Sequence, residues 1–171
     1  MGIVYRVPSL DELEKVSVQI VVSYVAAYEG QMDHEYLSSL KSDHWVPTLQ
    51  ESINNGDICL IAEGDGVIIG STVFGVDCNG QETYAQWHAF YLLPHFIGIG
   101  VGHAFYQQIE KEMIGRGCEY CELEVLSSNK RAIQFYLSHG FTKTKVFQVE
   151  EYGMTLSCDI MKKVFKKETM K

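Results

Sequence analysis

Three alternate glycines, Gly98, Gly100 and Gly102, lie between a stretch typical of a strand and a stretch typical of a helix. Glycines let backbone N–H groups approach an anion closely. The start of a helix adds unpaired N–H groups and the positive end of the helix dipole. The pattern therefore favours a turn that binds a pyrophosphate, and the alternative is a tight strand-to-helix connection without a ligand.

The spacing excludes two common phosphate-binding motifs. In the dinucleotide-binding fingerprint the third glycine falls later, and an acidic ribose ligand follows about 20 residues on, which this chain lacks. A P-loop needs Lys followed by Ser or Thr after its glycines, and no such pair follows Gly102.

Hydrophobic periodicity and turn residues predict the elements that hold this turn. Helices are expected over residues 10–29, opened by a capping box from Ser9 to Glu12, and over 33–40, 47–56, 100–116 and 129–138. Strands are expected over residues 58–63, 67–74, 83–93, 120–126, 141–149 and 155–164. This order predicts an α/β (α+β) fold with a mixed, mostly antiparallel central sheet of about six to seven strands and helices on both faces.

Length and charge narrow the class of protein. The 171 residues are 46% hydrophobic and 21% charged, so we expect one domain over residues 1–171, with a loose tail over about 165–171. Fourteen basic and 22 acidic residues give a net charge of −8, which argues against a nucleic acid partner. The charge suits a cationic substrate, or it serves solubility alone.

The start of the chain and its cysteines give two separate expectations. No basic segment followed by an apolar one opens the chain, and residues 16–28 are too short and too polar to span a bilayer. A soluble cytoplasmic protein with no membrane partner is expected. Cys118 and Cys121 have C-x-x-C spacing on an expected strand, where they would point to opposite faces. Buried free thiols, with no metal site, are therefore expected.

Two segments resemble the signatures of the GNAT superfamily of N-acetyltransferases. The first is Phe90-Tyr91-Leu92-Leu93-Pro94 at the end of a strand, followed by the turn over residues 98–102. The second runs over residues 129–141, with Ala three residues after Asn, then Phe-Tyr and Gly-Phe. The two segments lie in the family's order. Residues 23–40 are also similar to a bacterial subgroup, so the resemblance covers almost the whole chain.

The resemblance implies the GNAT-like acyl-CoA N-acyltransferase fold and direct transfer of acetyl from acetyl-CoA to a primary amine. The acceptor would be a small-molecule amine, with a cationic one favoured, or a peptide N-terminus. The positions that match the family's acetyl-CoA site are Phe90, Tyr91, Leu92, Ile97, Gly98, Ile99, Gly100, Val101, Gly102, His103, Asn129, Ala132 and Tyr136. Two positions depart from the pattern, because Ile97 replaces an Arg or Gln and Gln86 replaces a Glu that serves as base in many relatives.

The implied reaction needs a base and an acid. An alkylamine with a pKa of about 10.4 must lose a proton before it attacks. His88 shares a strand face with Gln86 and is the first candidate for the base, with Glu124 or a water chain as alternatives. The resemblance assigns Tyr136 as the acid, and Tyr136 lies on the same helix face as Asn129. A main-chain N–H over residues 90–92 is the expected donor to the thioester oxygen.

For several residues, the sequence leaves two interpretations open. Lys130 and Arg131 either reach the coenzyme's 3′-phosphate or are solvated. Aromatic residues either line the acceptor pocket or pack in the core, and acidic residues either flank the acceptor entrance, as in relatives, or are solvated. The aromatic residues are Tyr24, Tyr28, Trp45 and Tyr84, and the acidic ones Glu29, Asp33, Glu35, Glu150 and Glu151. Ile97 and Gln86 favour the alternative function, an acetyl-CoA-binding regulatory module without turnover. The acceptor and the oligomeric state, a homodimer included, stay open.

Overall fold

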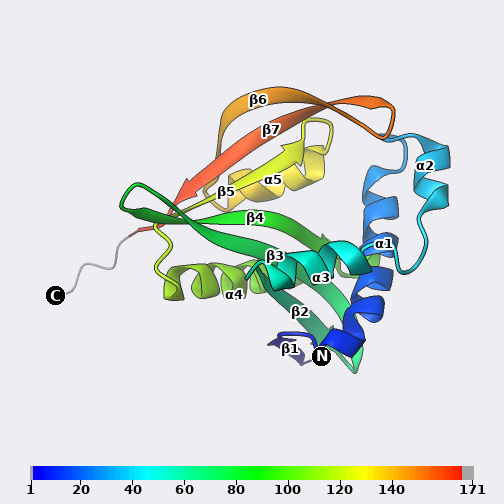
Figure 1. Cartoon of the computed structure of the whole chain (residues 1–171), viewed down its shortest axis with the longest axis horizontal. Helices are drawn as coiled ribbons and strands as arrows, with labels where there is room; N and C mark the ends of the chain where they lie inside the picture. Colours follow the sequence, from blue (N-terminus) through cyan, green and yellow to red (C-terminus); the bar gives the residue numbers. More distant parts are fainter. Residues whose placement is uncertain (1, 167–171) are drawn as a thin grey trace. The chain divides into compact units, whose positions relative to one another are not determined.

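The structure is a computed structural model that describes residues 2–166. Its elements, labelled in Figure 1, are β1 (Ile3–Arg6), α1 (Leu13–Tyr28), α2 (His34–Ser39), α3 (Val46–Asn54), β2 (Ile58–Gly64), β3 (Val67–Asn79), β4 (Glu82–Leu92), α4 (Val101–Gly115), β5 (Tyr120–Leu126), α5 (Lys130–Ser138), β6 (Thr142–Glu151) and β7 (Met154–Val164). The strands form a seven-stranded sheet in the order β1-β2-β3-β4-β5-β7-β6. Strands β4 and β5 are parallel, whereas β1–β2, β2–β3, β5–β7 and β6–β7 are antiparallel. The predicted mixed, mostly antiparallel sheet is confirmed.

The chain divides into two compact units. The first holds the chain up to Gly75 together with His88–Glu110, and the second holds Val76–Trp87 together with the chain from Lys111 onward. Strand β4 contributes to both units. One domain over the whole chain stays a prediction.

One face of the first unit's strands is covered by α1 and α3. Leu13, Val16 and Ile20 recur at helical spacing and are at most 4% exposed. They form one apolar cluster with Leu49, Cys59, Ile61 and Val73. Each fully buried aliphatic side chain of this kind contributes about 1.5–3 kcal/mol relative to exposure, so this cluster holds α1 and α3 on the strands.

Helix α4 covers the opposite face of the same strands. The ring of Phe105, fully buried, lies 5.6 Å from that of Phe90 on β4 and 5.3 Å from that of Tyr5 on β1. A Cβ at Gly70 would lie 2.7 Å from Leu92 and 3.3 Å from Phe105, so glycine allows this close approach without moving the Leu92 side chain. Within the first unit, helices on both faces are confirmed.

Strand β1 was not predicted. It is a four-residue edge strand that pairs with β2 from Ile3↔Gly64 to Arg6↔Ile61. Its sequence, Ile-Val-Tyr-Arg, does not alternate between apolar and polar residues, which is the pattern that predicts a strand. Val4 is apolar but 56% exposed. The predicted first helix also differs at its start, because residues 10–12 form a 3₁₀ turn and the α-helix begins at Leu13.

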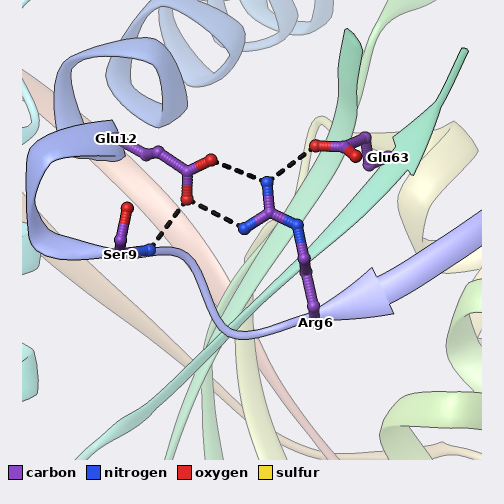
Figure 2. Close-up of polar contacts among 4 residues, drawn as sticks. All are labelled: Arg6, Ser9, Glu12 and Glu63. Carbon is purple, nitrogen blue, oxygen red and sulfur yellow. Dashed lines mark hydrogen bonds and ion pairs between the residues drawn. The ribbon is translucent and has the colours of Figure 1, made fainter. Parts of the chain in front are cut away.

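A polar network joins β1 to the 3₁₀ turn over residues 10–12 and to β2 (Figure 2). The Arg6 guanidinium donates to the Glu12 carboxylate over 2.8 and 2.6 Å and to Glu63 over 2.7 Å. Glu12 also accepts the backbone N–H of Ser9 over 2.8 Å, which is the Glu half of the predicted capping box. The Arg6 guanidinium lowers the pKa of Glu12 from 4.5 to about 2, so the Glu12 carboxylate is ionised at neutral pH.

The second unit is built on β5. Tyr84–Trp87 of β4 pair with Tyr120–Leu123, and on its other side β5 pairs with β7. Strands β6 and β7 form the long hairpin seen in Figure 1, whose turn has positive φ at Tyr152 (54°) and Gly153 (72°). Two expectations need correction here. Cys118 precedes β5 instead of lying on it, and Phe165, placed in the loose tail, is buried with its N–H donating to the Glu119 carbonyl over 2.9 Å. Residues 167–171 of that tail lie outside the described residues.

Cys118 and Cys121 are buried thiols, as predicted, and burial raises the pKa of the Cys118 thiol. Among residues 2–166, no helix combines the length and apolar character that a membrane crossing requires.

Candidate active site

The glycine turn connects β4 to α4 in the first unit. Gly98 and Gly100 have φ of 82° and 89°, which residues with a side chain rarely adopt. Within the described chain, no atom comes within 4 Å of a Cβ built on either glycine. The Gly100 carbonyl accepts the Ala104 N–H over 3.1 Å and so makes the first hydrogen bond of α4. The first-turn N–H groups have no acceptor inside the helix, so the turn presents open backbone donors to an anion.

The side chains around the turn add little polarity. Ile97 and Ile99 are 37% and 65% exposed, whereas Val101 is buried in the first turn of α4. Gly102 and His103 follow in the same turn, and His103 is exposed. An anion here would therefore be held by backbone N–H groups and the helix dipole.

The strand signature is partly buried over residues 90–93, whereas Pro94 is exposed. Phe90 packs on Phe105 of α4, whereas Tyr91 packs against the α1–α3 cluster, as strand alternation requires. The Tyr91 carbonyl accepts a hydrogen bond from Gln19 over 3.1 Å. These residues can therefore reach a ligand mainly through their remaining main-chain groups.

His88 lies on the exposed side of β4. Its side chain is 45% exposed, and its Nε2 lies 3.7 Å from Oδ2 of Asp57. Gln86, two residues earlier, is also exposed, whereas Trp87 between them is buried. The shared face that was predicted for Gln86 and His88 is thus confirmed. Glu124, the alternative base, is exposed on β5 in the second unit.

Helix α5 positions the second signature. Asn129 is its N-cap, and Asn129 Oδ1 accepts the Ala132 N–H over 3.3 Å. The amide nitrogen of Asn129 is therefore the part of the side chain suited to a ligand carbonyl. The Tyr136 ring is half-buried, 5.5 Å from Trp87 and 5.6 Å from Phe141. Lys130 folds back instead of extending, because its Nζ donates to the Ser127 carbonyl over 2.8 Å.

Most of the aromatic residues suggested for an acceptor pocket pack on one another in the first unit. The Tyr24 ring lies 4.6 Å from Tyr28 and 5.3 Å from Trp45, in edge-on contacts. Tyr24 is 7% exposed, and this burial raises its pKa. Tyr84 is separate, because it stacks on Tyr120 in the second unit with the rings 4.9 Å apart.

Asp57 is the neighbour of His88 that the sequence analysis missed. It lies between the end of α3 and the start of β2, and no local pattern links it to β4. The pairing follows from sheet register, since Ile58 pairs with Phe74 and so brings Asp57 beside Gly75 on β3.

A separate cleft of about 570 Å³ opens in the first unit, where the α2–α3 connection faces the start of α1. Glu14, Lys41, Asp43 and His44 supply its ionisable side chains. No predicted site residue lines it. The part of the chain that the structure describes holds no cluster of His, Cys, Asp and Glu placed to bind a metal ion.

Comparison with known proteins places the chain in a family. A profile described as "Acetyltransferase (GNAT) family" matches residues 24–141. Acetyltransferase ECA0875 of Pectobacterium atrosepticum is 36% identical over 81 residues, which cover 47% of this chain and 54% of that protein. The match thus spans about half the length of this curated relative.

Two solved structures have the same fold. The PaiA N-acetyltransferase from Thermoplasma acidophilum, in complex with coenzyme A, has a TM-score of 0.77 and 25% identity, covering 96% of this chain and 100% of that one. The yncA structure from Salmonella typhimurium, with its cofactor acetyl-CoA, has a TM-score of 0.71 and 17% identity, covering 100% and 98%. Because the profile match extends over more than half of the sequence and both signatures lie within it, the chain belongs to the acetyltransferase (GNAT) family.

Proposed function

We propose that this chain transfers the acetyl group of acetyl-CoA directly to a primary amine. The observation that carries the proposal is the open turn at Gly98 and Gly100, whose backbone donors lead into the N-terminus of α4. Family membership supplies the reaction class, and the turn supplies a place for the coenzyme's pyrophosphate.

The residues present fit the coenzyme. Pyrophosphate oxygens accept hydrogen bonds from backbone N–H groups, and the aligned peptides of α4 add roughly half a positive charge at its start. The space beside both glycines lets the anion approach. The apolar Ile97 removes one polar contact that relatives have, so binding should be weaker than with Arg or Gln there. When bound, the coenzyme supplies an acetyl group activated as a thioester.

The chain supplies the proton transfers. His88 takes a proton from the acceptor ammonium, since Gln86 cannot accept one at neutral pH. The amine nitrogen then forms a bond to the acetyl carbon as the carbon–sulfur bond breaks, and the nitrogen loses its second proton to water, from which Tyr136 later regains the proton that it gives to the sulfur. The Tyr136 hydroxyl gives its proton to the departing sulfur, and Asn129 holds the amides of the coenzyme arm through its side-chain nitrogen.

Exposed carboxylates favour a cationic acceptor. Glu29, Asp33 and Glu35 are all exposed where α1 ends and α2 begins in the first unit. Glu150 and Glu151 are exposed at the end of β6 in the second unit. With a net charge of −8, these groups would attract an ammonium, and salt would screen the attraction beyond about 8 Å at physiological ionic strength.

The proposal is tested by thiol release from acetyl-CoA with polyamines, aminoglycosides, amino acids and peptide N-termini, at low and high salt. Release with cationic amines that weakens with salt is expected. Preference for an acidic acceptor, or a rate that ignores salt, would contradict the cationic part. If calorimetry shows acetyl-CoA binding but no amine releases thiol, the chain is the regulatory module that Ile97 and Gln86 favour.

A further inference from the structure

The side chains of Asp57 and His88 face each other from segments that are not adjacent in the sequence. The distance between Asp57 Oδ2 and His88 Nε2 is 3.7 Å, and the side chains are 21% and 45% exposed. Asp57 directly precedes β2, and His88 is on β4, with β3 between these two strands in the sheet. The carboxylate is thus the more buried partner, and the imidazole reaches the surface.

Gly75 on β3 provides the space in which the two side chains meet. A Cβ at Gly75 would lie 2.7 Å from Asp57 Oδ1 and 3.2 Å from His88 Nε2. The φ angle of Gly75 lies outside the left-handed region, so the backbone itself would accept alanine. A methyl group here would make the Asp57 side chain move, because both polar atoms close over the position of the missing side chain.

We infer that Asp57 is a positioning residue for His88, which it orients with Nε2–H toward the carboxylate and Nδ1 free to accept the proton of the amine. This inference rests on the proposed function. A distance of 3.7 Å is too long for a hydrogen bond, so the carboxylate acts through its charge. That charge favours the tautomer whose N–H dipole points at it.

The same charge assists the proton transfer. As the proton moves from the amine nitrogen to Nδ1, the imidazole becomes an imidazolium, and a carboxylate at ion-pair distance stabilises that cation. The exposed edge of His88 then returns the proton to water. Asp57 therefore acts on the chemical step and touches neither the coenzyme nor the acceptor.

The test uses two variants with matched controls. Asp57→Asn removes the charge, and Gly75→Ala keeps both groups but pushes them apart. Asp65→Asn, in the exposed turn between β2 and β3, controls for the first, and Gly115→Ala, at the open end of α4, controls for the second. Thermal melts show that each protein is folded.

In the acceptor assay, Asp57→Asn and Gly75→Ala should lower kcat about tenfold, less than for a fully buried His–Asp pair because both side chains are partly exposed. The KM for acetyl-CoA should stay within about twofold, as should both parameters in the controls. His88→Gln should lower kcat at least as far, and adding Asp57→Asn to it should cost nothing more, because the two act as a unit. A kcat for Asp57→Asn equal to that of Asp65→Asn, or a further full loss in the double variant, would overturn the inference.

Nitrogen NMR of ¹⁵N-labelled histidine gives a readout that does not need turnover. Wild-type His88 should carry its neutral proton on Nε2, and both variants should shift toward a mixture of tautomers. A wild-type Nδ1–H tautomer refutes the assignment. If no amine releases thiol, the proposed function fails, while the NMR result still decides whether Asp57 orients His88.

Discussion

Replacing Gly100 by alanine tests the coenzyme turn most directly. Gly100 has a φ of 89° and open space around its Cβ position, so alanine would meet no protein atom of the described chain. Any effect must therefore come from the backbone conformation or from the ligand. A clash between protein side chains therefore cannot explain an effect of Gly100→Ala.

The expected losses of stability and of acetyl-CoA affinity follow from these two causes. If the turn keeps its shape, a residue with a Cβ costs about 1–2 kcal/mol in the left-handed region. At roughly 2–4 °C per kcal/mol for a chain of this length, the Tm falls by roughly 2–8 °C, and the new methyl group occupies the space through which the anion approaches. If the turn relaxes, the Gly100 region loses at least one hydrogen bond to a charged oxygen, worth about 1.5–3 kcal/mol, which raises the Kd about 10–150-fold.

Calorimetric titration with acetyl-CoA and a thermal melt measure both quantities. Gly98→Ala, at a φ of 82°, should behave in the same way. Gly115→Ala should change neither Kd nor Tm appreciably, because Gly115 lacks a positive φ and is also open. A folded Gly100→Ala protein with the wild-type Kd would refute the role of this turn in coenzyme binding.

Two further outcomes are expected. Tyr136→Phe should lower kcat about 10²-fold with little change in the KM for acetyl-CoA, because the hydroxyl acts as the sulfur leaves, and wild-type kcat under rate-limiting chemistry would move the acid role elsewhere. The pKa of Glu12 falls from 4.5 to about 2 on folding, so its contribution to stability is complete above pH 4.5 and is lost as the pH falls through about 2. Arg6→Gln should therefore flatten the loss of Tm between those pH values in circular dichroism melts, and parallel curves for both proteins would contradict the ion pair's role.

Elements defined by neighbouring residues were predicted to within a few positions. The Gly64–Gly66 turn has positive φ at Asp65 (52°) and Gly66 (78°), as a tight hairpin requires. Asn129 caps α5, and Gly30 follows α1 with a φ of 83°. Caps, turns and helical periodicity depend on contacts within a few residues, so their signals are present in the sequence itself.

Strand β1 could not be predicted from neighbouring residues. Its four residues carry no alternating pattern, and only pairing with β2 makes them a strand. Arg6 likewise has a partner in Glu63, on a strand far along the chain.

The candidate site likewise combines features that short sequence patterns define with a contact that only the tertiary structure creates. Residue types and short spacings sufficed for the glycine turn and the family, since each is a local pattern. Tertiary structure alone brought Asp57 to His88, because that contact depends on the registers of neighbouring strands and on the missing side chain of Gly75. A register shift of one residue would turn these side chains to opposite faces, and no local preference specifies it.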